Sequence, residues 1–373
     1  MHVMMVVNDT TFAYNLRREL LARLIRDGHE VSLLCSVISF REELETMGVR
    51  LLDVQYNRRG TNPLADLKLF VTYFKHLRKE RPDLILGNNI KPNVYAGLAC
   101  RLLKIRRICN ITGLGTALEQ PGLLQKITML LYKMGTWNAE CILFQNTENM
   151  AFFRAHKMLS PESRAVLLPG SGVNLEAHPA YPYPETEETH FLYIARILKE
   201  KGIDLYLAAA KEIRRRYPKT RFHICGSCDD GAYWEILKKA EADGDVLYHG
   251  EQKDMGPFYR ETHCVVHPSY YPEGMSNVLL EAAASARPAI ATDRSGCRET
   301  VDDGITGFVI PVKDVKALVD ALDRFMGMTW EARRNMGLAG RKKMEKEFDR
   351  TVVVNMVADE VNRCSGMERQ TVT

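Results

Sequence analysis

Two glutamates in one short segment have the type and spacing that binding an extended polar ligand would need. The segment HPSYYPEGMSNVLLEAA covers residues 267–283 and contains Glu273 and Glu281, eight positions apart. On a helix that rises about 1.5 Å per residue, this separation is roughly 12 Å. Two carboxylates so far apart cannot form an acid/base pair on one bond, but they can hold hydroxyl groups at two ends of a long ligand. The spacing fits equally well a turn residue at Glu273 and a partly buried, paired carboxylate at Glu281.

The start of the helix in this segment is a candidate phosphate site. Residues 272–274 (Pro-Glu-Gly) predict a turn, and the helix is expected to begin near Met275 or Ser276. Ser276 and Asn277 are suitable first-turn residues. Backbone N–H groups in the first turn of a helix have no partner within the helix, so they can bind a phosphate.

Arg196 and Lys201 form a second group of charged residues with a defined spacing. They flank the turn between an apolar run and a helical pattern that opens at Gly202. Two cations at the carboxyl end of a strand, close to a helix N-terminus, can clamp a diphosphate. An ordinary charged turn before a helix is the alternative.

The elements that must position these residues follow a βαβ rhythm. Short apolar runs alternate with longer helical patterns, which predicts parallel sheets with helices on both faces. The runs predicted as strands are 2–7, 30–35, 82–87, 106–111, 140–146, 165–170, 190–195, 221–226, 246–250, 264–269, 288–293 and 307–310.

The rhythm breaks once, at residues 178–189, where prolines and acidic residues are typical of a linker. We therefore predict an α/β protein with two doubly wound, Rossmann-like domains and a cleft between them. The expected parts are 1–173, a linker at 174–189, 190–348, and a C-terminal helix within 349–373 that can pack back on the first domain. Ligands of such sheets bind at the carboxyl ends of the strands, where the candidate residues lie.

The composition of the chain is that of a soluble globular protein. Of its 373 residues 46% are hydrophobic and 26% are charged, and no apolar run reaches the roughly 18 residues that span a bilayer. The first residues are read as a strand rather than a signal peptide. Nine scattered cysteines favour a reducing cytoplasm over a disulfide framework. Cys225 and Cys228 form a CxxC motif without a second pair at zinc-ligand spacing, so no metal site is expected.

The positive charge is concentrated in the first half of the chain. Residues 1–170 contain 23 lysines and arginines against 15 acidic residues, which favours an anionic partner. Residues 63–82 and 122–135 form basic amphipathic patterns, which can lie on an anionic membrane surface. An apolar stripe that faces the core is the alternative. No recognition motif or aromatic platform for nucleic acid is present, so no nucleic-acid partner is expected.

Several motifs, in order along the chain, resemble the retaining glycosyltransferases of family 4, which have the GT-B fold. PEGMSNVLLEAA has the spacing of the two glutamates of this family, and FLYIARILKEKGI, FHICGS, RPAIATDRSGCRETV and GITGFVIPVKD also resemble it. In the first half, NNIKPNVYAGLA, ICNITGLGTA, FQN and LPGSGV resemble a bacterial subgroup. That subgroup assembles capsules, O-antigens and glycoprotein glycans, often with galactose or N-acetylgalactosamine donors and acceptors on undecaprenyl diphosphate.

The resemblance implies a role for each matching residue of the second domain. Arg196 and Lys201 match the basic pair that stabilises charge on the leaving diphosphate. Glu273 matches the glutamate near the hydroxyls of the donor sugar, and Glu281 matches the glutamate on the nucleotide ribose. The other donor-binding matches are Gly274, Met275, Ser276 and Asn277 around the sugar and diphosphate, and Gly226 with residues 251–253, including Lys253, around the base.

The resemblance also assigns the acceptor to the first domain. Many members have a Gly-Gly loop after the first strand, but residues 8–17 contain no glycine, so the side chains of Asn15 and Arg17 are expected to serve instead. Ala195 replaces another common glycine. The remaining acceptor candidates follow strands 82–87 and 106–111 and are Asn89, Lys91, Thr112 and Gly113.

Lys91, with Asn88 and Asn89, is the candidate contact for an acceptor diphosphate. A solvated lysine before Pro92 is an equally weighted alternative. The glycines of TGLG (112–115) would expose backbone N–H groups to an anion or a sugar.

These expectations describe a cytoplasmic retaining glycosyltransferase at the inner face of a bacterial cell membrane. It would move a hexose, N-acetylgalactosamine or galactose, from a UDP-sugar to a sugar on undecaprenyl diphosphate. The UDP-sugar is a substrate, so no cofactor or metal is implied, and the leaving phosphate would assist proton removal from the acceptor. The alternatives are a transferase with a soluble acceptor, a UDP-sugar epimerase of related fold, and a non-catalytic binder of UDP-sugars or glycans.

Overall fold

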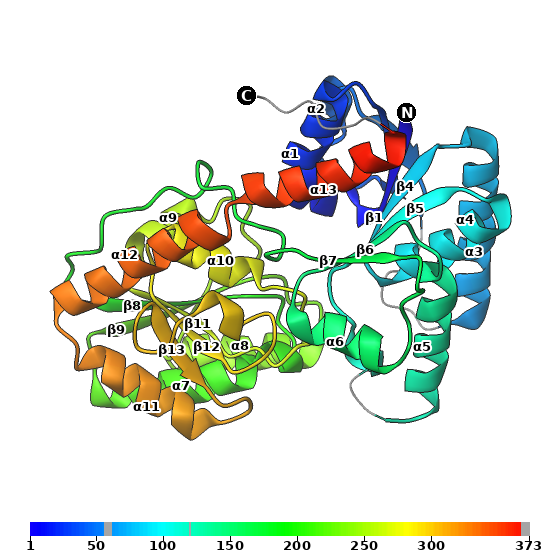
Figure 1. Cartoon of the computed structure of the whole chain (residues 1–373). Helices are drawn as coiled ribbons and strands as arrows, with labels where there is room; N and C mark the ends of the chain where they lie inside the picture. The colour runs from blue at the N-terminus through cyan, green and yellow to red at the C-terminus, as the bar shows by residue number, and fades with distance from the viewer. Residues whose placement is uncertain (56–61, 119–120, 367–373) are drawn as a thin grey trace. The chain divides into compact units, whose positions relative to one another are not determined.

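Two parallel β-sheets form the framework of the chain (Figure 1). The structure, a computed structural model, describes residues 1–55, 62–118 and 121–366. Contacts divide the chain into two compact units. Unit 1 contains Met1–Ser171 and the segment that starts at Thr351, and unit 2 contains Gly172–Arg350. The predicted fold class, α/β with two Rossmann-like domains, is confirmed.

Unit 1 contains a seven-stranded parallel sheet with the order β3-β2-β1-β4-β5-β6-β7. The direction in which strands are added reverses between β1 and β4, and ligands of doubly wound sheets bind at such a switch point. The strands are β1 (His2–Asp9), β2 (Glu30–Ser36), β3 (Arg50–Asp53), β4 (Leu84–Asn88), β5 (Arg106–Ile111), β6 (Cys141–Phe144) and β7 (Arg164–Leu167).

Alternating side chains of β1 bury both faces of this sheet. Val3 and Met5 join a core formed with α1 and α13, whereas Met4 and Val6 join a core formed with α3 and α4. The helical segments of the unit are α1 (Thr10–Arg26), α2 (Arg41–Thr46), α3 (Pro63–Glu80), η1 (Pro92–Ala96), α4 (Gly97–Leu103), η2 (Thr116–Leu118), α5 (Leu123–Thr136), α6 (Thr147–Ala155) and α13 (Arg350–Ser365). Asp9 starts α1, because its side chain accepts a hydrogen bond from the Phe12 N–H.

Unit 2 contains a six-stranded parallel sheet with the order β10-β9-β8-β11-β12-β13, whose switch point lies between β8 and β11. The strands are β8 (Thr189–Ile194), β9 (Thr220–Cys225), β10 (Leu247–Tyr248), β11 (Cys264–His267), β12 (Ala289–Thr292) and β13 (Gly307–Ile310). The helical segments are η3 (Lys199–Lys201), α7 (Ile203–Arg216), α8 (Gly231–Ala242), α9 (Gly256–Glu261), α10 (Asn277–Ala284), η4 (Arg298–Thr300), α11 (Val315–Met326) and α12 (Trp330–Glu347).

The segment 174–189, expected to be a linker, makes specific contacts within unit 2. The fully buried guanidinium of Arg287 donates to the carbonyl oxygens of Tyr181 and Pro182. The indole N–H of Trp330 donates to the carbonyl of Pro184 at 2.8 Å. At the other end of unit 2, α13 starts at Arg350, and its later residues pack in the core of unit 1.

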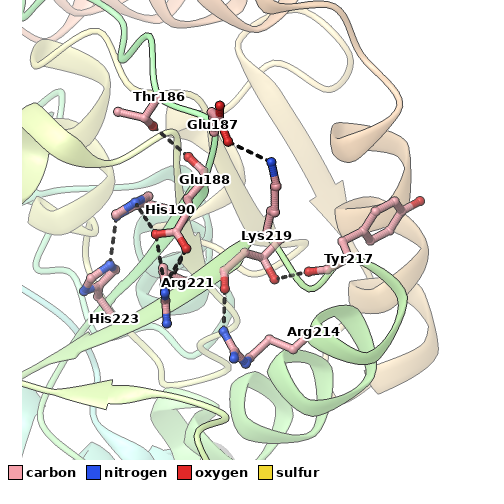
Figure 2. A network of polar contacts seen from close by, with 10 residues as sticks. Thr186, Glu187, Glu188, His190, Arg214, Tyr217, Lys219, Arg221 and His223 are labelled. Carbon is pink, nitrogen blue, oxygen red and sulfur yellow. Dashed lines mark hydrogen bonds and ion pairs between the residues drawn. The ribbon is translucent and has the colours of Figure 1, made fainter.

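Polar side chains connect the first residues of β8 and β9 (Figure 2). The guanidinium of Arg221 donates to both carboxylate oxygens of Glu188, and Lys219 pairs with Glu187 at 2.7 Å. The rings of His190 and His223 lie next to the Arg221–Glu188 pair, and Nδ1 of His190 is 3.0 Å from Nε2 of His223. These contacts fix the register of β8 against β9 on the side of the sheet where both strands begin.

None of the helices within residues 1–55, 62–118 and 121–366 combines the length and the apolar character that a membrane crossing requires.

Candidate active site

Lys201 and Glu273, 72 residues apart in sequence, form an ion pair in unit 2. Lys201 ends η3, which follows β8, and Glu273 lies in the loop between β11 and α10. Because β8 and β11 are parallel neighbours, the segments that follow them start at the same edge of the sheet. The sheet topology therefore brings together two of the three predicted catalytic side chains.

Positive charge around Glu273 keeps its carboxylate ionised. Burial, the largest single effect, would by itself raise the pKa of Glu273, but the charge and hydrogen bond of Lys201 together with the effects of His267 and Arg196 outweigh it. The net pKa of Glu273 is therefore lowered. Lys201 also lies over the ring of Tyr271, with Nζ 4.8 Å from the ring centroid. Arg196, the third predicted catalytic residue, thus belongs to the electrostatic surroundings of the pair.

Two glycines allow the segment with Arg196 and Lys201 to lie close to neighbouring backbone. A Cβ on Gly226 would lie 1.8 Å from the carbonyl oxygen of Ala195, and one on Gly202 would lie 2.2 Å from that of Pro268. Both glycines have positive φ angles, +149° and +78°. Position 226, which is predicted to lie near the base, therefore requires a glycine so that its backbone can pack against the segment that carries Arg196.

The expected phosphate site at the start of α10 is only partly available. The helix begins at Asn277, with Ser276 as its N-cap. The backbone N–H of Ser276 donates to the carbonyl of Gly296 at 2.7 Å, so this amide is not available to a phosphate. The Ser276 hydroxyl instead lies 3.2 Å from Nε2 of His267. Gly274 and Met275, which precede the helix, are buried.

The loop that holds Ser276 in this way was not predicted from the sequence. Glu299 accepts hydrogen bonds from the Gly296 N–H at 2.7 Å and from the Ser295 hydroxyl at 3.1 Å. It thereby fixes the carbonyl to which Ser276 donates. A serine and a glutamate four positions apart within RSGCRE resemble many turns, so the local sequence gave no specific signal.

Glu281 lies within α10 in a different environment from Glu273. Its carboxylate accepts a hydrogen bond from the hydroxyl of Tyr259 at 3.2 Å. Burial raises the pKa of Glu281 to about 7, against the smaller opposing effects of Tyr259 and Arg350. The two glutamates of the opening motif therefore differ, with one carboxylate paired to a lysine and the other close to its titration point at neutral pH.

The residues predicted to surround the base lie beyond β9 and β10. Gly226 donates its N–H to the Gly250 carbonyl at 2.8 Å, and its own carbonyl accepts from the hydroxyl of Tyr248 at 2.8 Å. Lys253 lies in the exposed segment after these contacts.

In unit 1, a polar cluster occupies the switch point between β1 and β4. Arg17 is 4% exposed, and its Nε donates to the side-chain oxygen of Asn88 at 3.3 Å. The same oxygen accepts from Asn110 at 3.0 Å, and Asn93 donates to the Asn110 backbone carbonyl at 2.8 Å. Arg17 therefore belongs to a buried network at the carboxyl ends of β4 and β5. Asn15, predicted with it, is exposed on α1.

The remaining acceptor candidates lie around the same strand ends. Asn89 has a positive φ of 71°, and its side chain joins the backbone N–H of Asn8 to the hydroxyl of Thr112. Gly113 follows Thr112, also with positive φ. Lys91 is not the solvated lysine considered as the alternative, because its Nζ pairs with Asp66 at 2.8 Å and its side chain is 16% exposed.

The described residues contain no group of three or more His, Cys, Asp or Glu side chains placed to hold a metal ion. Cys225 and Cys228, the two residues of the CxxC motif, are free thiols.

Comparison with known families accounts for both units. Residues 178–343 match the family described as glycosyl transferases group 1, and residues 2–146 match the family described as glycosyl transferase 4-like. The chain belongs to the GT-B glycosyltransferases. The resemblance to GT-B glycosyltransferases noted in the sequence is confirmed, and the protein is a glycosyltransferase.

Two curated relatives of this protein are named as sugar transferases. One is the N,N'-diacetylbacillosaminyl-diphospho-undecaprenol alpha-1,3-N-acetylgalactosaminyltransferase of Campylobacter jejuni, which is 25% identical over 83% of this chain and 85% of its own length. Another is the capsular polysaccharide biosynthesis glycosyltransferase CapM of Staphylococcus aureus, 24% identical over 85% of this chain and 86% of its own.

Solved structures share the fold. Sucrose-phosphate synthase from Thermosynechococcus elongatus is 19% identical, with a TM-score of 0.77, and the match covers 99% of this chain and 100% of that one. Anabaena HepE in complex with UDP-glucose is 14% identical, with a TM-score of 0.76, over 97% of this chain and 100% of that one.

Proposed function

We propose that this glycosyltransferase moves a hexose, N-acetylgalactosamine or galactose, from a UDP-sugar to a sugar on undecaprenyl diphosphate, with retention of configuration. The observation that carries the proposal is the largely buried Lys201–Glu273 ion pair beside Arg196. It combines cations suited to a diphosphate with an ionised carboxylate suited to sugar hydroxyls.

The donor would lie along the carboxyl edge of the unit 2 sheet. Arg196 and Lys201 would bind the diphosphate, Glu273 the sugar hydroxyls and Glu281 the ribose hydroxyls. Gly274, Met275 and Asn277 would surround the sugar and diphosphate, while Gly226 and Lys253 would lie near the base. Because the two cations neutralise the diphosphate themselves, we propose a transfer that needs no metal.

The reaction would exchange one bond at the anomeric carbon for another. The bond between the anomeric carbon and the diphosphate oxygen breaks, and the acceptor hydroxyl oxygen bonds to the same carbon from the same face. The acceptor proton passes to the leaving phosphate oxygen. Arg196 and Lys201 stabilise the negative charge that develops on that oxygen, so their effect is largest in the transition state.

The acceptor would bind at the switch point of the unit 1 sheet. The buried guanidinium of Arg17 and the side chains of Asn89 and Thr112 supply polar groups at the strand ends. Asn15, Lys91 and Gly113 are the other candidates in this region. The name of the Campylobacter relative, with a diphospho-undecaprenol acceptor, favours a lipid diphosphate here as well.

A surface of unit 1 also supports a lipid-linked acceptor. Helices α3, α4 and α5 lie side by side (Figure 1), and we name the exposed side chains on them and at the C-cap of α4 the apolar–basic surface. Its apolar members are Leu64, Leu67, Val71, Leu102, Leu123, Leu124, Ile127, Leu130 and Met134. Its basic members are Lys68, Lys75, Arg78, Lys79, Arg101, Lys104 and Lys126. Exposed leucines among cations match an anionic bilayer, so we propose that the protein binds the inner face of the cell membrane peripherally.

A panel of UDP-sugars, each tested for UDP release with and without a defined undecaprenyl-diphosphate-linked sugar, tests the proposal. We expect release that depends on the lipid acceptor and on one hexose. Equal release with a soluble sugar would favour the soluble-acceptor transferase, and sugar interconversion without an acceptor would favour an epimerase. Binding without any turnover would favour a UDP-sugar or glycan binder.

A further inference from the structure

His267 and Ser276 form a buried polar pair next to the Lys201–Glu273 ion pair. His267 is the last residue of β11 and Ser276 is the N-cap of α10, and each is 1% exposed. Nε2 of His267 and the Ser276 hydroxyl oxygen are 3.2 Å apart. The charges of Glu273 and Lys201 both act on the imidazole of His267. The pair therefore lies within the electrostatic reach of the proposed donor site.

The surroundings of the ring determine which nitrogen of His267 carries the proton. Burial, reinforced by Lys201 and opposed by Glu273, lowers the pKa of His267 to about 4, so the ring is neutral at neutral pH. Its Nδ1 is buried and has no hydrogen-bond partner within the described residues. A buried N–H without an acceptor is rarer in proteins than a bare acceptor. The proton is therefore assigned to Nε2, which donates to the Ser276 hydroxyl oxygen.

This assignment leaves the Ser276 hydroxyl with its own proton to donate. Its oxygen already accepts from His267, so the O–H is free to point at another acceptor. The backbone N–H of Ser276 is not free, because it donates to the Gly296 carbonyl. At this position the hydroxyl, and not the backbone amide, is left as a possible donor to an anion at the helix N-terminus.

We propose that His267 is a positioning residue that holds the Ser276 hydroxyl as a hydrogen-bond donor to the leaving diphosphate. The inference rests on the proposed function, because it requires a nucleoside diphosphate sugar at this site. Negative charge grows on the leaving phosphate as the bond to the anomeric carbon breaks. A donor that is already aimed at that oxygen stabilises the transition state more than the ground state.

A double-mutant cycle tests this role. Ser276→Ala removes the donor, His267→Leu removes the group that aims it, and kcat and KM are measured for each single variant and for the double variant. We expect each single change to lower kcat roughly 100-fold with little change in KM, as for the loss of one preorganised donor. The double variant should be no worse than either single one, because His267 acts through the hydroxyl.

His267→Gln is the conservative variant, since its side-chain amide can donate to the hydroxyl from nearly the same place. It should recover most of the activity lost in His267→Leu. Ser285→Ala is the matched control, because Ser285 is a fully buried serine at the C-cap of the same helix. That control should keep wild-type kcat. If His267→Leu does not fold, Ser276→Ala and His267→Gln still test the proposal.

Two results would overturn the inference. One is a wild-type kcat in Ser276→Ala, and the other is a fall in activity on His267→Leu that is equally large in the Ser276→Ala background. Failure of the proposed function would look different, since the wild-type protein would then neither bind UDP nor release it from a UDP-sugar.

Discussion

The ammonium group of Lys201 and the carboxylate of Glu273 form an ion pair in which only 13% and 15% of the two side chains remain exposed. Each group is the main counter-charge that the structure gives the other, and Arg196 adds a further positive charge beside Glu273. A buried ion pair contributes little net stability, but the loss of one partner leaves the other charge buried and uncompensated.

Lys201→Met should therefore affect both stability and transfer. We expect a loss of about 3–5 kcal/mol in the free energy of unfolding. In the variant that remains folded, we expect a fall in kcat of at least about 100-fold, because under the proposed function the leaving diphosphate would lose a cation. Chemical denaturation and UDP-release assays measure the two effects. Lys199→Met, an exposed lysine in the same turn, should change neither. A folded Lys201→Met with near wild-type kcat would contradict the assignment.

Glu281→Gln should stabilise the protein at alkaline pH. The folded-state pKa of about 7 lies above the ordinary value of 4.5. Stability from the protonated carboxyl is therefore present at low pH and is lost as pH rises through 7. Each pH unit between the two values corresponds to about 1.4 kcal/mol. Thermal melts at pH 5 and pH 8 should show a gain for the variant mainly at pH 8. Glu235→Gln, at an exposed position of α8, should show no such gain.

Arg17→Lys should impair the acceptor step and leave the donor step intact. The planar guanidinium of Arg17 donates to both the Asn88 side chain and the Leu16 carbonyl, which a lysine cannot reproduce. We expect UDP to bind this variant with wild-type affinity, while transfer to the lipid-linked sugar falls about 10-fold or more. Calorimetry with UDP and a transfer assay separate the two steps. Arg18→Lys is the control, since Arg18 lies partly exposed over Tyr14. Weaker UDP binding in Arg17→Lys would contradict the acceptor role.

A row of histidines should make unit 2 sensitive to acid. His223 lies between His249 and His190, with ring nitrogens 2.9 and 3.0 Å apart. Burial, followed by the charges of these two histidines, lowers the pKa of His223 to about 4. The lowered pKa makes the unfolded chain bind more protons than the folded one, so stability falls as pH drops from about 6.5 to about 4.

His223→Gln should reduce this loss of stability at acidic pH. The slope of unfolding free energy against pH should fall by up to about 1.4 kcal/mol per pH unit between pH 6 and pH 4.5. Exposed His156 supplies the control His156→Gln, whose slope should equal that of the wild type. An unchanged slope in His223→Gln would contradict this origin of acid sensitivity. The charged side chains that also act on the row are Glu188, Arg221, Glu241 and Glu261.

The fold could be predicted because its signals are local and repeated. Twelve apolar runs marked strands, and the thirteenth, β3, was missed because its four residues begin with Arg50 and end with Asp53. The strand is short and only half-buried, so it lacks an apolar run. The sequence motifs placed Lys201 and Glu273 in one site, after neighbouring strands, but did not predict that the two side chains form an ion pair.

The finer contacts depend on segments that are far apart in the sequence. The Gly296 carbonyl, which accepts a hydrogen bond from the Ser276 amide, lies in a loop 20 residues further along the sequence. Asp66, which pairs with Lys91, lies on α3, 25 residues earlier. His190 and His223 are on different strands and His249 follows a third, so no spacing marks them as a row. Such contacts follow from the packing of distant strands and loops, which local patterns do not specify.

The apolar–basic surface should bind vesicles through α5 in particular. This helix exposes Leu124, Ile127 and Leu130 and contains no acidic residue, so no negative charge on it opposes an anionic bilayer. Replacement of these three residues by Gln should abolish sedimentation with vesicles rich in phosphatidylglycerol, because each buried apolar side chain contributes about 1.5–3 kcal/mol. UDP release with a water-soluble acceptor analogue should remain.

Two controls separate membrane binding from general loss of surface hydrophobicity. Ile305, Val312 and Val315 are exposed apolar residues of unit 2, and their replacement by Gln should leave sedimentation unchanged. Lys126→Glu should weaken binding at low salt more than at high salt, because it acts through the surface charge of the bilayer. Wild-type sedimentation of the α5 variant would show that this helix does not contact the membrane. The proposed lipid-linked acceptor would then have to reach Arg17 without α5 as an anchor.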